Sequence, residues 1–257
     1  MRLKDKVAII TGAGRGIGRA IAVGFAKEGA KLVLVSRTES ELSETADLIV
    51  NNGDNAIWYA IDLRDEERIN WVVEITQEKF GRVDILVNNA GALLLKSTVD
   101  MTTEEWDYIL DVNLRGVFIF SREVLKIMIG QNYGKIINFS SQLGRQGMAA
   151  RSAYSAAKFG VIGLTESMAS EVKKYNININ AICPGGVDTK MVRECFPPGD
   201  YTKLMQPEDI SKVALFLASD ESRAIKGKVI ESYGGQDLVG FADDVEFRWI
   251  VTCDGTT

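Results

Sequence analysis

The feature that most constrains the fold of this chain is an alternation of short apolar runs with segments of helical spacing. The apolar runs are of strand length and lie at Lys6–Thr11, Lys31–Ser36, Ala56–Ile61, Val83–Asn88, Lys135–Ser140, Ile177–Cys183 and Lys228–Ser232. Helical spacing occupies the segments Gly16–Glu28, Ser40–Asn51, Glu66–Phe80, Thr103–Leu110, Leu114–Ile129, Ser152–Ser170 and Pro207–Ala218. Strands that are apolar throughout and separated by helices indicate a parallel sheet covered on both faces. The alternation therefore predicts an α/β fold, a doubly wound parallel sheet of about seven strands in a single domain.

Polar residues and glycines gather where the predicted strands end. They are Thr11-Gly12, Ser36-Arg37, Asp62, Asn88–Gly91, Ser140-Ser141 and Pro184-Gly185. The carboxyl ends of parallel strands share one edge of a sheet, and ligands of doubly wound sheets bind outside that edge. The sequence therefore predicts a binding site along it.

The first strand runs directly into a glycine-rich turn, T-G-A-G-R-G-I-G, from Thr11 to Gly18. Gly12 would permit a tight bend, Gly16 would let the backbone approach a pyrophosphate, and Gly18 would let the helix pack closely on the sheet. Free N–H groups and the helix dipole favour a phosphate at the start of that helix. A glycine pattern can also be a plain turn, but its place between a strand and a helix favours nucleotide binding in a Rossmann-type sheet.

The end of the second predicted strand indicates which nucleotide binds. Domains that bind NAD place an acidic residue there for the ribose 2′-hydroxyl, whereas an arginine accommodates the 2′-phosphate of NADP. This chain has Ser36 and Arg37 there and Arg15 in the glycine turn, and we expect no carboxylate between the two guanidinium groups. These residue types favour NADP(H) over NAD(H), against the alternative of two merely solvated arginines.

Tyr154 and Lys158 are the strongest candidates for acid–base chemistry. The chain has no histidine, which excludes Ser-His-Asp and Cys-His catalysis and histidine metal sites. On a helix the two side chains share one face, and a lysine charge lowers the pKa of a neighbouring tyrosine towards neutrality. A Tyr-x-x-x-Lys motif also arises by chance in many chains of this length, so the pair needs support from its surroundings.

Composition narrows the class of protein. The formal net charge is −5, and the basic residues form no stripe, so nucleic acid is not an expected partner. The apolar runs are shorter than the ~20 residues that cross a bilayer. The three cysteines, Cys183, Cys195 and Cys253, show neither a metal-binding spacing nor a disulfide framework. We expect a cytoplasmic protein with no membrane partner and no metal site.

Further motifs follow in a definite order along the chain. They are Asp62-Leu63, N-N-A-G at Asn88–Gly91, Asn113 in N-L-R-G, Ser141 thirteen residues before Tyr154, P-G-G-V-D-T at Pro184–Thr189, and I-E-S-Y-G-G at Ile230–Gly235. Together with the glycine turn and Lys158, they resemble the short-chain dehydrogenase/reductase family over about residues 4–238, in the spacing of its single-domain oxidoreductases. We therefore expect residues 1–238 to form one NADP-binding domain with a built-in catalytic site.

The resemblance implies hydride transfer between NADP(H) and a carbonyl or secondary alcohol, as in 3-oxoacyl-carrier-protein reductases and related carbonyl reductases. It implies that Ser141 binds the substrate oxygen and that Tyr154 donates or accepts the proton. Lys158 would also bind the nicotinamide ribose, and Asn113 would hold a water that relays protons to Lys158. The residues implied in cofactor binding are Gly12, Arg15, Gly16, Ile17, Gly18, Ser36, Arg37, Asp62, Leu63, Asn89, Gly91, Tyr154, Lys158, Pro184, Gly185, Val187 and Thr189. The family also implies a homo-oligomer, a tetramer or a dimer.

Substrate contacts are less well defined. The family forms its substrate lid between Thr189 and Gln206. We expect Leu143, Met191 and Phe196 to join Ser141 and Tyr154 in a moderately apolar substrate pocket, and the sequence does not identify the carbonyl compound.

The C-terminal segment, residues 239–257, extends beyond the usual end of such domains. Apolar residues alternate with partly polar ones over Val245–Thr252, which predicts a strand. A free strand exposing Phe247 and Trp249 would invite aggregation. We therefore expect this extension to pack on a neighbouring subunit.

Two other functions stay open. Nucleotide-sugar epimerases and dehydratases share Tyr-x-x-x-Lys, but they usually have a different glycine spacing and a larger C-terminal substrate region. A sensor that binds NADP without turnover usually lacks the tyrosine or the lysine, and both are present here. Loss of turnover in a Tyr154→Phe variant with intact cofactor binding would separate a reductase from a sensor.

Overall fold

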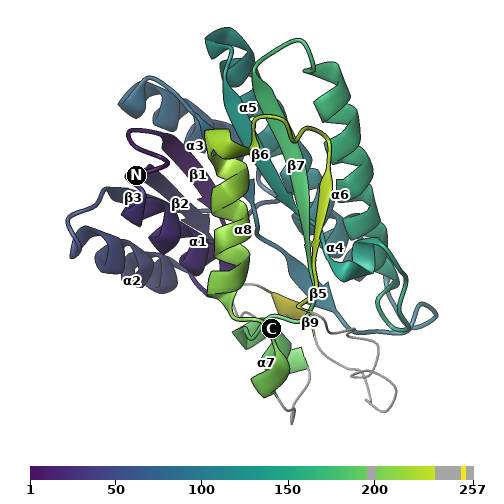
Figure 1. Ribbon diagram of the computed structural model, residues 1–257. Helices are drawn as coiled ribbons and strands as arrows, with labels where there is room; N and C mark the ends of the chain where they lie inside the picture. The colour runs from purple at the N-terminus through teal and green to yellow at the C-terminus, as the bar shows by residue number, and fades with distance from the viewer. Residues whose placement is uncertain (196–200, 235–249, 253–257) are drawn as a thin grey trace.

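The centre of the molecule is a parallel sheet, as the apolar runs predict. The computed structural model describes residues 1–195, 201–234 and 250–252. Within this part of the chain the sheet has seven strands: β1 (Val7–Thr11), β2 (Lys31–Ser36), β3 (Ala56–Ala60), β4 (Ile85–Asn88), β6 (Gly134–Phe139), β7 (Ile177–Pro184) and β8 (Val229–Ser232). Their order is β3-β2-β1-β4-β6-β7-β8 (Figure 1). The order reverses between β1 and β4, which is where a doubly wound sheet opens a crevice for ligands.

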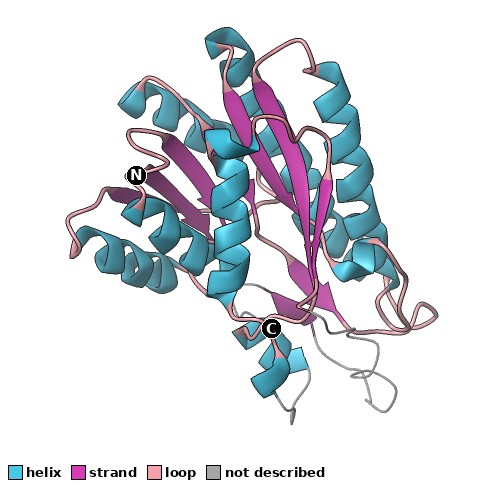
Figure 2. Cartoon of the chain, viewed as in Figure 1, coloured by secondary structure: helices cyan, strands magenta, loops and turns pink. Residues whose placement is uncertain are grey.

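Helices cover both faces of this sheet (Figure 2). One face carries α1 (Gly16–Lys27), α2 (Glu39–Val50) and α8 (Pro207–Ala218), whose apolar side chains form one core cluster with the strands. The other face carries α3 (Glu66–Phe80), α5 (Gly116–Gln131) and α6 (Ser152–Glu171), which share a second cluster. Successive residues of β1 alternate between them, because Ile9 belongs to the second cluster and Ile10 to the first. Both residues are fully buried. This confirms the predicted doubly wound α/β fold.

Local sequence explains where several helices begin and end. At α4 (Thr103–Leu110), the Thr102 hydroxyl accepts from the Glu105 N–H, and the Glu105 carboxylate accepts from the Thr102 N–H, which is a capping box. Asp65 caps α3 by a single hydrogen bond, accepting from the Arg68 N–H, and that helix ends at Gly81 with φ of 73°. These contacts fix the helix bounds within a residue or two of the positions that the sequence predicts.

Several short elements of the described chain were not predicted, among them a π-helical turn, a short helix and the strand β5. A π-helical turn, η1 (Asp111–Arg115), continues directly into α5. A short helix, α7 (Lys190–Cys195), follows the sheet at β7. The strand β5 (Ala92–Leu94) pairs antiparallel with β9 (Ile250–Thr252), below the carboxyl ends of the sheet and next to α7 (Figure 1).

The strand predicted over Val245–Thr252 is present in its last three residues as β9, which pairs with the same chain. Phe247 and Trp249 lie outside the described residues. Packing of the extension on a neighbouring subunit therefore stays a prediction.

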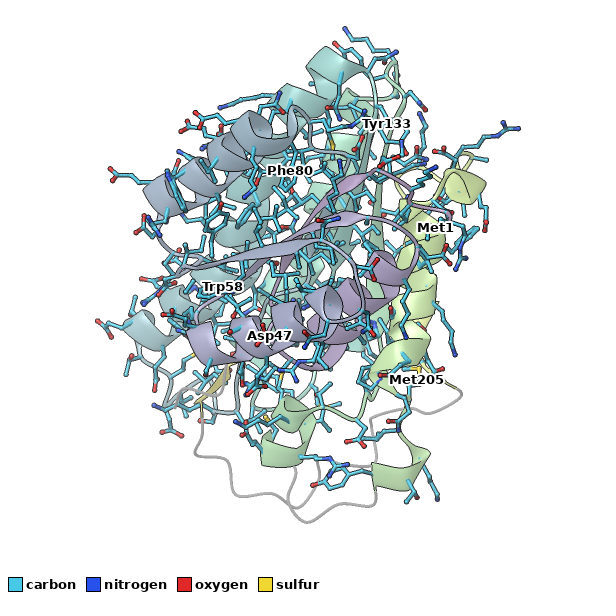
Figure 3. All side chains as sticks on the ribbon, turned by 90° about the vertical axis from the view of Figure 1, so that its left-hand side faces the viewer. Met1, Asp47, Trp58, Phe80, Tyr133 and Met205 are labelled. Atoms are coloured by element: carbon cyan, nitrogen blue, oxygen red, sulfur yellow. The ribbon has the colours of Figure 1, made fainter. Side chains whose placement is uncertain are left out.

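The predicted site residues lie at one end of the sheet. Tyr133, just before β6, lies near one end of the molecule, whereas Met205, bridged to Val187 after β7, lies near the other (Figure 3). The residues singled out by the sequence lie at the Met205 end, where the strands reach their carboxyl ends. Across the described ranges, we find no helix with both the length and the apolar character needed to cross a membrane.

Candidate active site

A hollow follows the carboxyl ends of the strands and consists of two pockets that share Gly12 and Gly91. The larger pocket contains most of the predicted residues: Gly12, Arg15, Gly16, Ile17, Asn89, Gly91, Ser141, Leu143, Tyr154, Lys158, Pro184, Gly185, Val187, Thr189 and Met191. The smaller one is lined by Ser36, Arg37, Asp62 and Leu63, among others. Gly18 and Asn113 support the hollow from behind, and Phe196 lies outside the described residues.

The glycine turn depends on its glycines for distinct reasons. Gly12 and Gly16 have φ of +66° and +53°, which side chains rarely allow. A Cβ on Gly12 would also come within 2.8 Å of Asn89 Nδ2. Gly18 packs so closely that a Cβ there would collide with the carbonyl oxygen of Gly12. The turn is therefore an open cradle of backbone groups at the start of α1, as phosphate binding requires.

The Thr11 side chain fastens this cradle to the segment after β4. Its hydroxyl donates to the carbonyl oxygen of Val87 at 3.3 Å and accepts from the backbone N–H groups of Asn89 and Ala90 at 3.0 and 3.1 Å. Asn89 Nδ2 donates to the Thr11 carbonyl oxygen at 3.0 Å. The two predicted motifs, which are far apart in the sequence, thus form one rigid wall.

Asn113 is a fully buried anchor within the π-helical turn. Its Nδ2 donates to the carbonyl oxygens of Ala92 and Ile109 at 2.8 and 2.9 Å, and its Oδ1 accepts from the Ala92 N–H at 3.2 Å. A Cβ on Gly91 would lie 2.7 Å from Asn113 Oδ1 and 3.5 Å from Lys158 Nζ. The three residues thus meet at one point, and Asn113 ties β5 to the helix that precedes α5.

Lys158 lies beside Tyr154 on α6. Its Nζ is 5.5 Å from the centre of the Tyr154 ring and donates to the carbonyl oxygen of Phe139 at 2.9 Å. Only 3% of Lys158 is exposed. A charge held in so little water acts more strongly on its neighbours than a solvated one.

The two serines at the end of β6 have different contacts. Ser140 Oγ donates to the carbonyl oxygen of Lys158 at 2.8 Å, so this hydroxyl fastens α6 to the sheet. Both serines line the larger pocket, but Ser141 Oγ accepts from the Leu143 N–H at 3.1 Å. An acceptor hydroxyl keeps its own proton available for another partner. This geometry suits Ser141 as the donor to a substrate oxygen.

Asp62 and Arg37 both line the smaller pocket, and Tyr108 and Arg64 connect them by a chain of contacts. Arg37 Nη1 donates to the Tyr108 hydroxyl at 3.0 Å, and the Arg64 guanidinium lies 5.1 Å from the centre of the same ring. Arg64 also donates to both oxygens of Asp62, at 2.7 to 3.2 Å. Burial alone would raise the pKa of Asp62, but these bonds outweigh it and lower the pKa. Tyr108 was not among the predicted residues.

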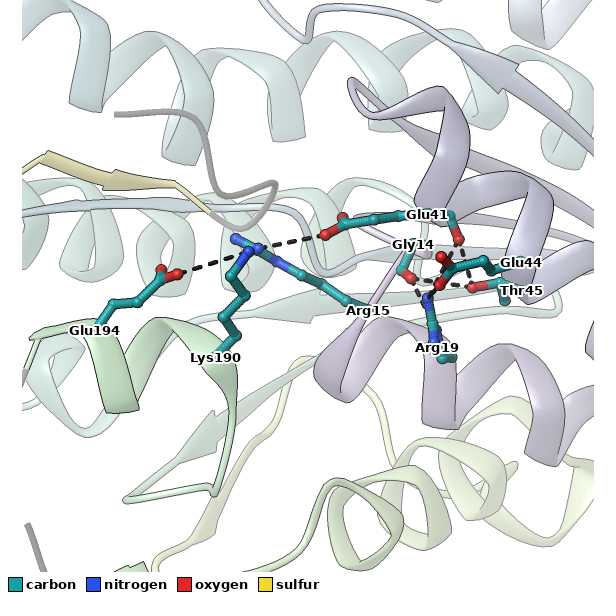
Figure 4. A network of polar contacts seen from close by, with 8 residues as sticks. All are labelled: Gly14, Arg15, Arg19, Glu41, Glu44, Thr45, Lys190 and Glu194. Atoms are coloured by element: carbon teal, nitrogen blue, oxygen red, sulfur yellow. Dashed lines mark hydrogen bonds and ion pairs between the residues drawn. The ribbon is translucent and has the colours of Figure 1, made fainter.

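The expectation of no carboxylate between the guanidinium groups was wrong. Arg15 Nη1 lies 3.4 Å from Glu41 Oε1, and both side chains are mostly buried (Figure 4). Glu41 lies on α2 and lines the smaller pocket with Ser36, whose hydroxyl is buried without a hydrogen-bond partner among the described residues. In the sequence Glu41 looks like an ordinary helix-surface residue, and only the packing of α2 beside Gly14 turns it inwards.

The end of the larger pocket around Leu143 and Met191, where the sequence predicts substrate binding, is mostly apolar. Leu143 is buried, and Met191 packs with Leu93, Leu95 and Cys195 against Tyr154. The sequence analysis did not single out Met148 or Arg151, which also line it. Arg151 lies just before α6 with non-helical backbone angles, so helical spacing from Tyr154 does not identify it.

Comparisons with known proteins agree with this geometry. A model of the short chain dehydrogenase family matches residues 6–198. The 3-oxoacyl-[acyl-carrier-protein] reductase FabG of Thermotoga maritima is 38% identical over 243 residues, which cover 91% of this chain and 99% of that relative. A levodione reductase structure has a TM-score of 0.87 at 36% identity, covering 91% of this chain and 98% of its own. A structure of a variant actinorhodin polyketide ketoreductase with NADPH has a TM-score of 0.85 at 31% identity, covering 90% and 96%.

Proposed function

The chain belongs to the short-chain dehydrogenase family and is an oxidoreductase, and from this premise we propose that it transfers a hydride between NADP(H) and a carbonyl or secondary alcohol substrate. One observation carries the proposal. Ser141, Tyr154 and Lys158 line the same pocket as the glycine turn, so the proton donor and the nucleotide cradle share one space. No observation on the described residues specifically favours an epimerase or a sensor.

Each side chain has a chemical task in this proposal. The Ser141 hydroxyl donates a hydrogen bond to the substrate oxygen and stabilises the charge that develops there. Tyr154 gives its proton to that oxygen during reduction, and its phenolate takes the proton back during oxidation. The Lys158 charge favours the phenolate. A bound nicotinamide supplies or accepts the hydride. Asn113 holds Gly91 and β5 in place behind Lys158, and we propose that it also positions the water that reaches this lysine.

We also propose that NADP(H) is preferred to NAD(H). The glycines of the turn leave a cradle that any Cβ would fill, which fits a pyrophosphate. Arg37 and Ser36 line the smaller pocket, and the Ser36 hydroxyl is buried without a hydrogen-bond partner among the described residues. Both side chains support this preference, because each can donate a hydrogen bond to a 2′-phosphate. The ketoreductase relative with NADPH gives further support. Glu41 disfavours NADP(H), because its carboxylate repels a 2′-phosphate and competes with it for Arg15.

Family membership supports two broader proposals. We propose that the protein is cytoplasmic and assembles into a homo-oligomer, a tetramer or a dimer. Size-exclusion chromatography with light scattering measures the assembly directly, and a monomer at micromolar concentration would contradict it.

A tyrosine substitution tests the proposed reaction. We expect wild type to oxidise NADPH with members of a ketone panel, and Tyr154→Phe to lose about 10²–10⁴-fold in kcat. Tyr175→Phe, in the connection between α6 and β7, is the matched control and should keep its rate. Quenching of tryptophan fluorescence by NADPH measures cofactor binding independently. Binding without turnover by wild type across the panel would favour the sensor.

The adjacent serines provide a second matched pair. Ser141→Ala should lower kcat about 10²-fold, because a donor to the developing negative charge is lost. Ser140→Ala should instead lower the free energy of unfolding by about 1 kcal/mol, because its hydroxyl bonds to the Lys158 carbonyl. An equal loss of kcat in both variants would contradict the assignment of Ser141.

A further inference from the structure

Lys190, the first residue of α7, is a charged lining residue of the larger pocket without a task in the proposed reaction. The described lining of that pocket contains four cationic residues, Arg15, Arg151, Lys158 and Lys190, and no carboxylate. Arg151 and Lys158 are almost fully buried, whereas the Lys190 side chain is more than half exposed. Its amine can therefore meet a ligand that enters from solvent, and a lining of this charge favours an anion.

The backbone brings Lys190 to the start of α1. Thr189, the preceding residue, lies against the glycine turn, because a Cβ on Gly16 would come within 3.3 Å of Thr189 Cγ2. The Thr189 hydroxyl oxygen accepts from the Val192 N–H at 3.3 Å, so the same side chain also holds the first turn of α7. Gly16 is the glycine that lets the backbone approach a pyrophosphate. The Lys190 side chain thus begins next to the place expected for that group.

Hydrogen bonds outside the Lys190 side chain fix the segment that carries it. The Asp188 N–H donates to the Met205 carbonyl oxygen at 2.8 Å, and the Met205 N–H donates to the Gly186 carbonyl oxygen at 3.1 Å. The Arg193 guanidinium donates to both oxygens of Asp188, at 2.6 and 2.7 Å. The place of Lys190 beside the glycine turn therefore does not depend on its own amine.

The ion pair between Lys190 and Glu194 is weak. Lys190 Nζ lies 3.7 Å from Glu194 Oε1, and the two side chains are 56% and 36% exposed. This distance is longer than a hydrogen bond, and exposed pairs contribute little to stability. A lysine four residues before a glutamate is also the less favourable order on a helix. The amine can therefore exchange this carboxylate for a more strongly charged anion at small cost.

The charged ends of Arg15 and Lys190 lie between the carboxylates of their partners, Glu41 and Glu194 (Figure 4). Both cations line the larger pocket, and neither carboxylate does. Two like charges that face one pocket repel each other, and an anion bound between them relieves that repulsion. The site is thus suited to an anion at the glycine turn.

Resting on the proposed function, we propose that Lys190 binds the pyrophosphate of the bound nucleotide and gives up Glu194 as it does so. Its ammonium then donates a charge-assisted hydrogen bond to the group that the glycine turn cradles. The cofactor would thereby hold α7 against the start of α1. NADPH and NADH both contain a pyrophosphate, so Lys190 would strengthen the binding of both. Arg37 differs, because its proposed partner is the 2′-phosphate of NADPH alone.

Cofactor affinity tests this proposal without catalysis. The Kd values of NADPH and NADH would be measured at low ionic strength from the quenching of tryptophan fluorescence. Lys190→Met should raise both values about tenfold, whereas Lys190→Arg should stay within about threefold of wild type. Lys212→Met is the matched control, because it removes the same charge from α8, where Lys212 pairs with Asp209 outside the pocket. Unchanged values in Lys190→Met, or a loss confined to NADPH, would overturn the proposal.

A substitution of Glu194 tests the exchange of partners independently. Glu194→Gln removes the competing carboxylate and should lower the Kd of NADPH about twofold to threefold. Glu208→Gln makes the same change of charge at an exposed position outside both pockets and should leave the Kd unchanged. An equal or higher Kd in Glu194→Gln would contradict the exchange. Failure of the proposed function would look different, because wild type would then bind NADPH without oxidising it with any member of the ketone panel.

Discussion

Glu41 is the residue with the greatest consequence for the choice of nucleotide. It lies on α2 yet contacts Arg15 in the glycine turn, and its Oε2 would come within 3.3 Å of a Cβ on Gly14. A carboxylate at this place opposes a 2′-phosphate, whereas Arg37 across the same pocket attracts one. We therefore expect the proposed preference for NADP(H) to depend on both charges and not on one arginine alone.

Substitution of Glu41 and substitution of Arg37 should change the ratio of kcat/KM for NADPH over NADH in opposite directions. Glu41→Gln should raise the ratio of kcat/KM for NADPH over NADH about fivefold, the equivalent of about 1 kcal/mol. Arg37→Met should lower the same ratio by at least as much. Glu44→Gln is the control, because Glu44 is largely exposed and pairs with Arg19. A rise in the ratio for Arg37→Met would contradict this account.

Asp62 makes stability depend on pH. Its pKa is lowered below the ordinary value of 3.8, because hydrogen bonds from Arg64 outweigh the effect of burial. Folding thus favours the carboxylate, and this contribution is present above 3.8 and lost as the pH falls through the lower folded value. In urea titrations between pH 6 and 2, the free energy of unfolding should fall more for wild type than for Asp62→Asn, by no more than about 1 kcal/mol. Parallel curves for the two proteins would rule out this contribution.

At the scale of elements, the π-helical turn and β5 form one unit through Asn113. The turn is defined by the Gly116 N–H donating to the carbonyl oxygen of Asp111. This register directs Asn113 into the sheet edge, where its side chain satisfies both backbone groups of Ala92. The π-helical geometry therefore has a specific use, as such turns often have at functional sites.

Loss of that side chain should affect both stability and the site. Asn113→Ala leaves the buried backbone groups of Ala92 without their partner, so we expect a loss of about 2–4 kcal/mol in urea unfolding. Asn178→Ala is a matched control, because Asn178 is equally buried and donates to three carbonyl groups near the other end of β7. Both variants should lose stability, but only Asn113→Ala should also lose NADPH turnover per folded molecule. Full turnover in Asn113→Ala would contradict its assigned place behind Lys158.

At the scale of the whole molecule, the C-terminal extension returns to the site. The pairing of Ala92 with Thr252 and of Leu94 with Ile250 joins the C-terminal segment to the strand after β4, beside the proposed substrate pocket, which Leu93 lines. An edge strand next to an active site is thereby covered by the same chain. Through β9, the extension supports the strand that carries Leu93, and this holds whether or not it also contacts another subunit.

Removal of residues 239–257 should therefore weaken the substrate pocket. We expect a lower Tm and a several-fold higher KM for the carbonyl substrate, with little change in NADPH binding, because β9 pairs with β5 and not with the glycine turn. A chain that ends after Thr252 keeps β9 and is the control. A change in oligomer size only in the shorter chain would support packing on a neighbouring subunit. Unchanged Tm, KM and oligomer size would contradict both roles.

Much of this architecture could be predicted because its causes are local. The apolar runs gave all seven strands of the main sheet, and Glu66–Phe80, Thr103–Leu110 and Pro207–Ala218 match their helices residue for residue. The strand β5 was not predicted, because three apolar residues carry too little periodicity and its partner, β9, lies far along the chain near the C-terminus. The π-helical turn was missed for a similar reason, since no residue type is specific to it.

The sequence by itself determined the order of strands and helices and the polar residues at each strand end, because periodicity and turn chemistry act between neighbours in the chain. From these followed the glycine turn and the grouping of Ser141, Tyr154 and Lys158 at one edge. Only the tertiary structure decided which charges face one another. Glu41 reaches Arg15 because α2 packs beside the glycine turn, and Arg151 is buried because other segments enclose it. Electrostatic interactions depend on distance in space and on burial, and neither quantity is written in the spacing of residues along a chain.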